Sequence, residues 1–352
     1  MTNESSPTER STNTATTSTT ATDDHPSDQT TAELRAGVIG VGKMGRNHAR
    51  VYRELADVDL VGVADQDTTA ASEVASKYGT SQLSTDALLA VADVVTVAVP
   101  TPAHPAVVQQ CLDAGVHVLV EKPFVTDLEV GRALAEQAEA ADLTLQVGHI
   151  ERFNPAVQTV ADVVKELDII AIDAERLGPP VDRSLGTGVV FDLMIHDLDV
   201  ASALHGGDVV SLNATGTHDG EYATASCEFD DGVIATFTAS RVTQQKVRRL
   251  GITTKSCHIS VDYMNQSVSI HRGAVPEYVQ TNGDIRHRTE SVEERPFVEN
   301  GEPLRAELTS FLNAVRTGDP PQVTAADGLR AVELATRIEE LTGVRYPEEM
   351  TA

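Results

Sequence analysis

The sequence is poor in basic residues, in cysteine and in long apolar segments. Its 352 residues include 27 lysines and arginines against 53 aspartates and glutamates, giving a formal net charge of −26, and only six of the bases are lysines. Nucleic-acid binding is disfavoured, because a duplex needs basic side chains to neutralise its phosphates. We therefore look for a small-molecule ligand.

The three cysteines, Cys111, Cys227 and Cys257, are too few and too scattered for a disulfide framework or a zinc ribbon. We expect them to be buried thiols. No stretch approaches the ~20 apolar residues of a membrane span, and the N-terminus lacks the basic-then-apolar layout of a signal peptide. These absences predict a soluble, cytoplasmic protein.

Acidic residues occur in all regions of the chain, so the charge is expected over the whole surface. Such a surface is typical of proteins from salt-loving organisms, where salt screens the self-repulsion. Residues 1–33 are dominated by Ser, Thr, Asn and Asp without apolar periodicity, which predicts a disordered tail.

A glycine-rich motif, GVGKMG at 40–45, follows a short apolar run and precedes a helical pattern. Gly40 permits a tight turn, Gly42 lets the backbone approach a pyrophosphate, and Gly45 lets helix and strand pack closely. With Lys43 and Met44, these residues predict a dinucleotide site at the helix N-terminus, whose free N–H groups favour an anion. The alternative is an ordinary glycine turn in an α/β unit.

Asp65 directly follows the next predicted strand, 59–64, and lies 20 residues beyond Gly45. An acid at this place hydrogen-bonds the adenosine ribose and repels a 2′-phosphate, so we predict NAD as the cofactor.

Strands and helices alternate from residue 34 to 153, which predicts an α/β Rossmann domain with a doubly wound parallel sheet. Ligands bind at the carboxyl ends of such strands, so we expect Pro100, Thr101, His104 and Glu121 to line the cofactor site. The predicted strands are 36–41, 59–64, 93–99, 116–120 and 143–148, and the predicted helices are 44–56, 68–78, 104–114 and 127–141.

The remaining residues, 154–352, predict an α+β domain for substrate binding and oligomerisation, with one antiparallel or mixed sheet. A strand at 168–177 precedes a helix at 188–205, and four or five strands run through 209–272. Residues 273–302 are predicted as a long surface loop, and helices at 304–316 and 325–341 end the chain.

Three stretches supply candidate catalytic and substrate-binding residues. Lys122, before Pro123 at the end of a strand, can donate to a substrate oxygen and, partly desolvated, take part in proton transfer; the alternative is a solvated surface lysine.

Asp192, His196 and Asp199 share one helical face at i, i+4 and i+7. A carboxylate-backed histidine is a plausible general base, although the same residues could bind a divalent metal or form a solvated face. Arg152, with Asn154 in the stretch GHIERFNP at 148–155, could bind a phosphate or carboxylate, or simply link two domains.

Together these stretches resemble the glucose-fructose oxidoreductase/inositol dehydrogenase (Gfo/Idh/MocA) family over residues 35–345. The resemblance is carried by GVIGVGKMGRNHARVY at 37–52, AVPTPAH at 98–104, VLVEKPF at 118–124 and GVVFDLMIHDLDV at 188–200. It implies an open-faced second sheet, a homo-oligomer (dimer or tetramer), and catalytic roles for Lys122, Asp192 and His196 without a metal. GHIERFNP resembles the branch of the family that acts on nucleotide sugars.

We therefore predict an NAD-dependent enzyme that oxidises a sugar hydroxyl. An inositol or free-monosaccharide dehydrogenase is the alternative within the enzyme class. A catalytically silent dinucleotide sensor or scaffold is the alternative outside it, since a fold does not determine a function.

Overall fold

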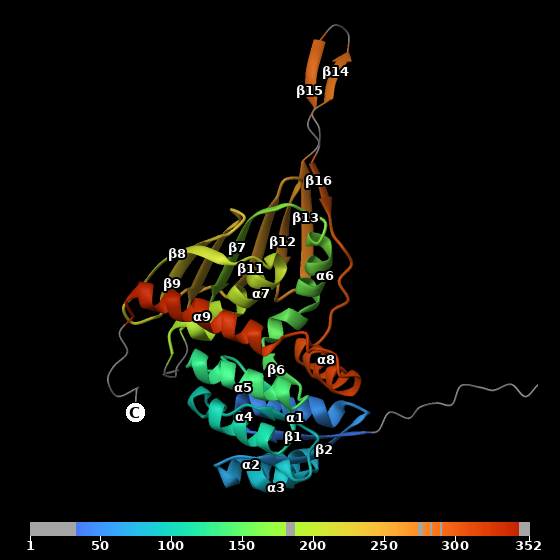
Figure 1. The fold of residues 1–352 in the computed structure, drawn as a ribbon. Helices are drawn as coiled ribbons and strands as arrows, with labels where there is room; N and C mark the ends of the chain where they lie inside the picture. The colour runs from blue at the N-terminus through green and yellow to red at the C-terminus, as the bar shows by residue number, and fades with distance from the viewer. Residues whose placement is uncertain (1–32, 181–186, 274–276, 282–283, 289–290, 345–352) are drawn as a thin grey trace, which may run out of the picture. The chain divides into compact units, whose positions relative to one another are not determined.

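The computed structural model describes residues 33–180, 187–273, 277–281, 284–288 and 291–344. The predicted tail, 1–33, lies outside the described residues except for Glu33. Figure 1 shows two sheets with helices packed against each.

The first sheet is parallel and has six strands in the order β3-β2-β1-β4-β5-β6. This is the strand order of doubly wound dinucleotide-binding folds, and it confirms the predicted fold class. Its strands are β1 Leu34–Ile39, β2 Val58–Ala64, β3 Ser81–Gln82, β4 Val94–Val97, β5 His117–Glu121 and β6 Leu145–Gly148. Its helices are α1 Lys43–Glu54, α2 Thr68–Tyr78, α3 Thr85–Leu89, α4 His104–Asp113 and α5 Leu128–Ala140.

All four residues of β4 are buried, as expected for a strand covered on both faces by helices. The short elements β3 and α3 were not predicted, because two residues of strand and five of helix are too short to show a period. The carboxyl ends of β1, β4 and β5 meet at one edge of the sheet, where the glycine turn and Lys122 lie.

The second sheet is mixed: β10 pairs with β7 in parallel, and the other neighbours are antiparallel. Its eight strands have the order β16-β13-β12-β11-β7-β10-β9-β8. The strands are β7 Ile169–Leu177, β8 Val209–Gly216, β9 Tyr222–Phe229, β10 Ile234–Ser240, β11 Val247–Thr254, β12 Cys257–Asp262, β13 Ser267–Gly273 and β16 Ser291–Glu294.

Helices α6 Pro155–Val164, α7 Ile195–His205 and α9 Ala325–Thr342 pack along one face of this sheet (Figure 1). Burial alternates along β9 and β10, so that Ala225, Cys227 and Phe237 lie on the helix-covered face, between more exposed neighbours. No helix among the described residues covers the other face in Figure 1, which agrees with the open-faced sheet that the family resemblance implies.

Two predictions for this part of the chain were wrong. The expected loop at 273–302 contains β16 and a separate two-stranded sheet, β14 Glu277–Thr281 and β15 Asp284–Arg288. The Asn-Gly pair at 282–283 between them is a strong hairpin signal that outweighs the polar composition. Helix α6 was also missed, although Asn154 caps it and Pro155 occupies its first turn, both typical helix starts.

Helix α8, Pro303–Thr317, packs against the first sheet although it follows the second sheet in sequence. Its buried residues Leu304, Leu308 and Phe311 share a hydrophobic cluster with β1, α1 and β2. The predicted division of the chain at residue 154 assigned α8 to the second part, whereas its apolar residues pack with the first.

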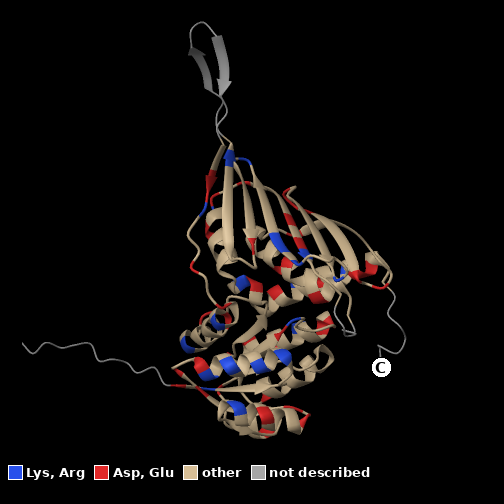
Figure 2. Cartoon of the chain, turned by 180° about the vertical axis from the view of Figure 1, so that it is seen from behind, with Lys and Arg blue, Asp and Glu red and all other residues tan. Residues whose placement is uncertain are grey.

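Charged residues are spread over both parts of the fold: Figure 2 shows Asp and Glu on the helices around the first sheet and on the strands of the second. Within the part of the chain that the structure describes, we find no helix with the length and apolar character that a membrane crossing requires.

Candidate functional site

The glycine turn has the geometry that its sequence predicted. Gly40 has φ +91°, and a Cβ there would lie 2.6 Å from the backbone of Ala98. A Cβ on Gly45 would lie 1.8 Å from the carbonyl oxygen of Gly40, so any other residue would separate the turn from α1. Gly42 caps α1, and a Cβ there would meet nothing within 4 Å. The space beside Gly42 is therefore open to a phosphate.

Asp65 lies against this turn. Its carboxylate accepts hydrogen bonds from the backbone N–H of Val41 at 2.6 Å and of Asp67 at 2.9 Å. The acid therefore has a fixed orientation, beside the turn, in which it can bind the ribose hydroxyls of a dinucleotide.

A cavity of about 850 Å³ follows the carboxyl edge of the first sheet from the glycine turn to Lys122. It is large enough for a dinucleotide-sized ligand. The predicted cofactor residues on its wall are Gly40, Gly42, Met44, Asp65, Pro100, Glu121 and Lys122. Lys43, Gly45, Thr101 and His104 are not on this wall, although all four lie in the segments that form it.

His104 has a structural position that the sequence did not reveal. Its ring is buried, with Nε2 2.9 Å from the carbonyl oxygen of Val99 and Nδ1 3.0 Å from that of Pro123. The imidazole thus ties the loop after β4 to the loop that carries Lys122. Its assignment to the cofactor stays a prediction.

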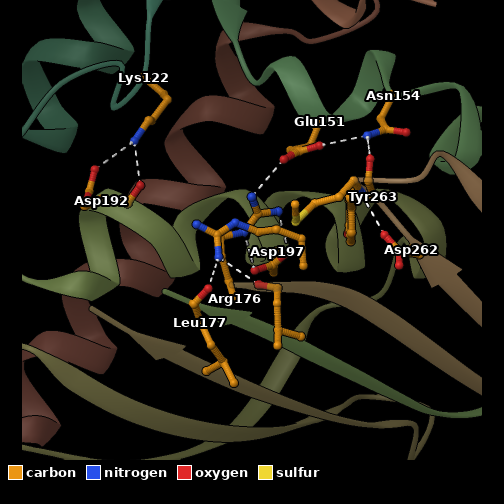
Figure 3. A network of polar contacts seen from close by, with 12 residues as sticks. Lys122, Glu151, Asn154, Arg176, Leu177, Asp192, Asp197, Asp262 and Tyr263 are labelled. Carbon is orange, nitrogen blue, oxygen red and sulfur yellow. Dashed lines mark hydrogen bonds and ion pairs between the residues drawn. The ribbon is translucent and has the colours of Figure 1, made fainter. Parts of the chain in front are cut away.

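Lys122 leaves β5 toward the second sheet. Its Nζ donates to the backbone carbonyl oxygen of Asp192 at 2.8 Å and lies 3.9 Å from the Asp192 carboxylate, as Figure 3 shows. Burial lowers the pKa of Lys122, and the charges of Asp192 and Glu121 oppose that change. The amine is therefore oriented and largely buried, with 17% of the side chain exposed, and its lowered pKa suits a proton-transfer group.

A buried chain of polar groups lies behind Lys122. The Glu121 carboxylate is 2.8 Å from Nε2 of His48, whose Nδ1 is 3.3 Å from the Thr96 hydroxyl, which in turn is 3.0 Å from the Tyr52 hydroxyl. Burial acts to raise the pKa of Glu121, but the hydrogen bond and charge of His48 outweigh it, so the pKa lies below its usual value. Sequence patterns missed this chain because its members come from α1, β4 and β5.

Asp192 and His196 lie where a π-helical turn, Val190–Met194 (η3), continues into α7. Such turns frequently occur at functional sites. The Asp192 carboxylate contacts Lys122 and also Arg241, at 3.6 Å.

The sequence predicted a carboxylate partner for His196, and the structure, in the part of the chain that it describes, does not place one at Nδ1. Nδ1 of His196 has no hydrogen-bond partner among the described residues. Asp199, the predicted third member of the face, is buried and lies 3.0 Å from Nε of Arg152. Helical spacing placed these side chains on one face, but partners from other elements separate them.

His196 is surrounded by cations. Burial lowers its pKa well below the usual 6.5, and the charges of Lys122, Arg176 and Arg248 lower it further. The neutral imidazole therefore persists at neutral pH and can accept a proton.

Arg176 on β7 holds this helix to the sheet, and the sequence did not single it out. Its guanidinium donates two hydrogen bonds of 2.8 Å to Asp197 and one of 2.8 Å to Glu151 (Figure 3). Asn154 donates to Glu151 at 3.2 Å and to the carbonyl oxygen of Tyr263 at 3.1 Å. These bonds set the position of the α7 segment next to His196.

The Arg152 side chain lies 3.0 Å from Asp199 and 3.4 Å from Asp327. Two carboxylates therefore already balance its charge. A substrate-binding role for Arg152 and Asn154 stays a prediction. In the ranges that the structure describes, no three His, Cys, Asp or Glu residues are grouped as a metal ion would require.

The fold and this cavity define a class: a dinucleotide-dependent oxidoreductase with a parallel Rossmann sheet and a second, mixed sheet. A family profile described as "Oxidoreductase family, NAD-binding Rossmann fold" matches residues 34–149, and one described as "GFO/IDH/MocA C-terminal domain" matches residues 172–259. The chain belongs to the Gfo/Idh/MocA family of NAD-dependent oxidoreductases, as its sequence motifs indicated.

The chain is similar to curated dehydrogenases over most of its length. UDP-N-acetylglucosamine 3-dehydrogenase of Acidithiobacillus ferrooxidans is 37% identical over 87% of this chain and 96% of that enzyme. Inositol 2-dehydrogenase of Rhizobium meliloti is 30% identical over 86% of this chain and 94% of that enzyme. A solved structure of the Acidithiobacillus enzyme superposes with a TM-score of 0.81 at 34% identity, covering 88% of this chain and 97% of that one.

Proposed function

We propose that this oxidoreductase oxidises the C3 hydroxyl group of UDP-N-acetylglucosamine. The hydroxyl proton goes to a base and the hydride of C3 goes to NAD, giving the 3-keto nucleotide sugar and NADH. The observation that carries the proposal is the similarity to the Acidithiobacillus enzyme, 37% identity over 96% of its length. The stretch GHIERFNP at 148–155, typical of the nucleotide-sugar branch, supports the same choice.

We assign the proton step to His196 and Lys122. The imidazole of His196, which burial and the nearby cations keep neutral in the free enzyme, accepts the hydroxyl proton. Lys122 donates a hydrogen bond to the same substrate oxygen, and Asp192 orients the amine. The glycine turn and Asp65 would hold NAD, which would supply the hydride acceptor when bound.

The test compares UDP-N-acetylglucosamine, N-acetylglucosamine and inositol at matched concentration in high salt, with absorbance of NADH as the readout. The keto product is coupled to an aminotransferase, because the oxidation alone can be unfavourable. We expect turnover of the nucleotide sugar. Turnover of inositol or the free sugar, with none of the nucleotide sugar, would reject the substrate while leaving the NAD chemistry intact.

An inositol or free-monosaccharide dehydrogenase is the second candidate, supported by the 30% identity to the Rhizobium enzyme. Its substrate carries no phosphate, so its rate should not depend on a cation in the substrate site. The sensor alternative has no use for Lys122 on the cavity wall with Asp192 held against its amine.

We further infer a cytoplasmic homo-oligomer, a dimer or tetramer, adapted to high salt. Support comes from the open face of the second sheet, where β7, β11 and β12 form a shallow hollow of about 280 Å³ lined by Asp173, Glu175, Arg249 and Ser260, among others. Light scattering after size-exclusion chromatography in molar salt tests the oligomer, and a monomeric mass would contradict it.

A further inference from the structure

A diphosphate substrate requires a cation in its binding site, and most arginines near Lys122 are already paired. Arg152 contacts Asp199 and Asp327, and Arg176 contacts Asp197 and Glu151. Arg241 lies 3.2 Å from Glu221 and 3.6 Å from Asp192. Each of these three guanidinium groups is balanced by two carboxylates.

Arg248 on β11 differs from these three. Its Nη1 donates to the backbone carbonyl oxygens of Leu177 at 2.6 Å and of Val247 at 2.7 Å. Among the described residues, no carboxylate lies within ion-pair distance of it. The side chain is half-buried. A guanidinium has five N–H donors, so several remain for a ligand.

The sheet register places Arg248 on the same face as the site. Arg248 is directly opposite Arg176 in the antiparallel β11–β7 pair, and opposite residues project from the same face of a sheet. Arg176 in turn binds Asp197, which follows His196. The hydrogen bond to Leu177 therefore holds the guanidinium of Arg248 next to Arg176, the residue that binds Asp197 on α7.

The electrostatics agree with this position. The charge of Arg248 contributes to the lowered pKa of His196. Burial lowers the pKa of Arg248 itself, as does the neighbouring charge of Arg176, whereas Asp197, Glu151 and Asp192 oppose the change. Arginine remains protonated in proteins, and because Arg176 is already balanced by Asp197 and Glu151, Arg248 is the group that leaves local positive charge here.

We infer that Arg248 forms an anion subsite that binds the diphosphate of the nucleotide sugar, a role resting on the proposed function. Planar N–H donors fit phosphate oxygens, and the bonds to Leu177 and Val247 hold the group in place before the ligand arrives. Arg248 would also favour a nucleotide sugar over a free sugar, because only the nucleotide sugar carries a negative charge that can bind the guanidinium.

The experiment measures binding of UDP to the full-length protein in the presence of NADH, at one fixed salt concentration, by calorimetry. Uridine, which lacks phosphate, serves as the uncharged probe. The variants are Arg248→Gln, which removes the charge, and Arg248→Lys, which keeps it. Lys255→Gln is the matched control, since Lys255 follows the other end of β11 and pairs with Asp168 on the surface.

We expect Arg248→Gln to weaken UDP binding and raise KM for UDP-N-acetylglucosamine by roughly 10- to 100-fold, the usual loss of a charge-assisted hydrogen bond. Arg248→Lys should lose less, while uridine binding and the melting temperature should change little in both variants. An equal loss of UDP affinity in Lys255→Gln would indicate a general effect of the protein's charge and overturn the subsite.

The outcomes for subsite and substrate are separable. If the protein oxidises UDP-N-acetylglucosamine and Arg248→Gln leaves its KM within twofold, the subsite is wrong and the proposed function stands. If UDP binds in an Arg248-dependent manner but the nucleotide sugar is not oxidised, the subsite stands and the proposed function is wrong. Failure of UDP to bind the unaltered protein overturns the subsite.

Discussion

The amine of Lys122 donates to the backbone carbonyl oxygen of Asp192 at 2.8 Å, while the carboxylate of the same residue lies 3.9 Å away. This contact joins the end of a strand in the parallel sheet to the π-helical turn before α7. The lysine is thereby held by a neutral acceptor and faces an acid without being fully neutralised by it. Such an amine is available to a substrate oxygen.

The carboxylate of Asp65 should make the enzyme prefer NAD to NADP. Two backbone N–H groups already orient the acid, so a 2′-phosphate would meet repulsion and lose the ribose hydrogen bonds, on the order of 1 to 3 kcal/mol. We expect kcat/KM with NAD to exceed that with NADP roughly tenfold or more. Asp65→Ser should narrow the ratio, and equal rates with both cofactors in the unaltered protein would contradict the argument.

Replacing either proton-handling group should reduce turnover. His196→Leu and Lys122→Met should each lower kcat by roughly 100-fold or more, the range of general acid–base catalysis. The affinity for NAD, measured by fluorescence titration, should change much less. His218→Leu, at an exposed turn between β8 and β9, is the matched control. Near-normal turnover in His196→Leu would assign the helix face a structural role only.

The enzyme should keep its oxidation rate at pH values below 6.5. Because burial and neighbouring cations lower the pKa of His196 well below 6.5, the neutral base survives as the pH falls below that value. We expect the acidic limb of the kcat/KM profile to have its midpoint below pH 6.5. A midpoint at or above 6.5, or an unchanged limb in His196→Leu, would show that another group titrates.

Glu307 on α8 should reduce stability at neutral and alkaline pH. The side chain is fully buried, neither oxygen has a hydrogen-bond partner among the described residues, and burial raises its pKa well above 4.5, with Glu121 and Asp199 adding repulsion. Above pH 4.5 the folded state therefore holds a proton that the unfolded state releases, so the free energy of unfolding falls as the pH rises toward the folded-state pKa.

Glu307→Gln removes that dependence without changing the size of the side chain. We expect the variant to be more stable than the parent at pH 8, because the amide cannot ionise in its buried position, and the difference to shrink at pH 5. Thermal unfolding at both values measures it. Glu340→Gln, on the exposed side of α9, is the control and should show no such pattern. A variant less stable than the parent at pH 8 would show that the carboxylate is stabilised where it lies.

Salt should stabilise the folded protein. A formal charge of −26 means that like charges repel in the compact state, and ions screen that repulsion. We expect the melting temperature to rise from dilute buffer to molar sodium chloride. A melting temperature indifferent to salt over that range would contradict the surface-charge interpretation.

Local patterns were sufficient for five of the six strands of the first sheet and for the glycine turn. Gly40, Gly42 and Gly45 have local roles, because each concerns the backbone within a few residues, so spacing alone predicts them. Sequence alone also predicts β4, from its continuous apolar run, and α9, from its helical period. Polar composition misled at β14–β16, where a hairpin needs only a short pair of strands and a turn.

The partners of the charged residues depended on contacts between distant segments. Spacing on one helix put Asp192, His196 and Asp199 together, but Asp199 is 128 positions from Asp327, with which it shares Arg152. Likewise, Arg248 faces the site because β11 pairs with β7 in a particular register, and a shift of one residue would turn it to the opposite face. Which arginine is paired and which is free for a ligand follows from folding, since a charge is balanced by whatever the tertiary structure brings within a few ångströms of it.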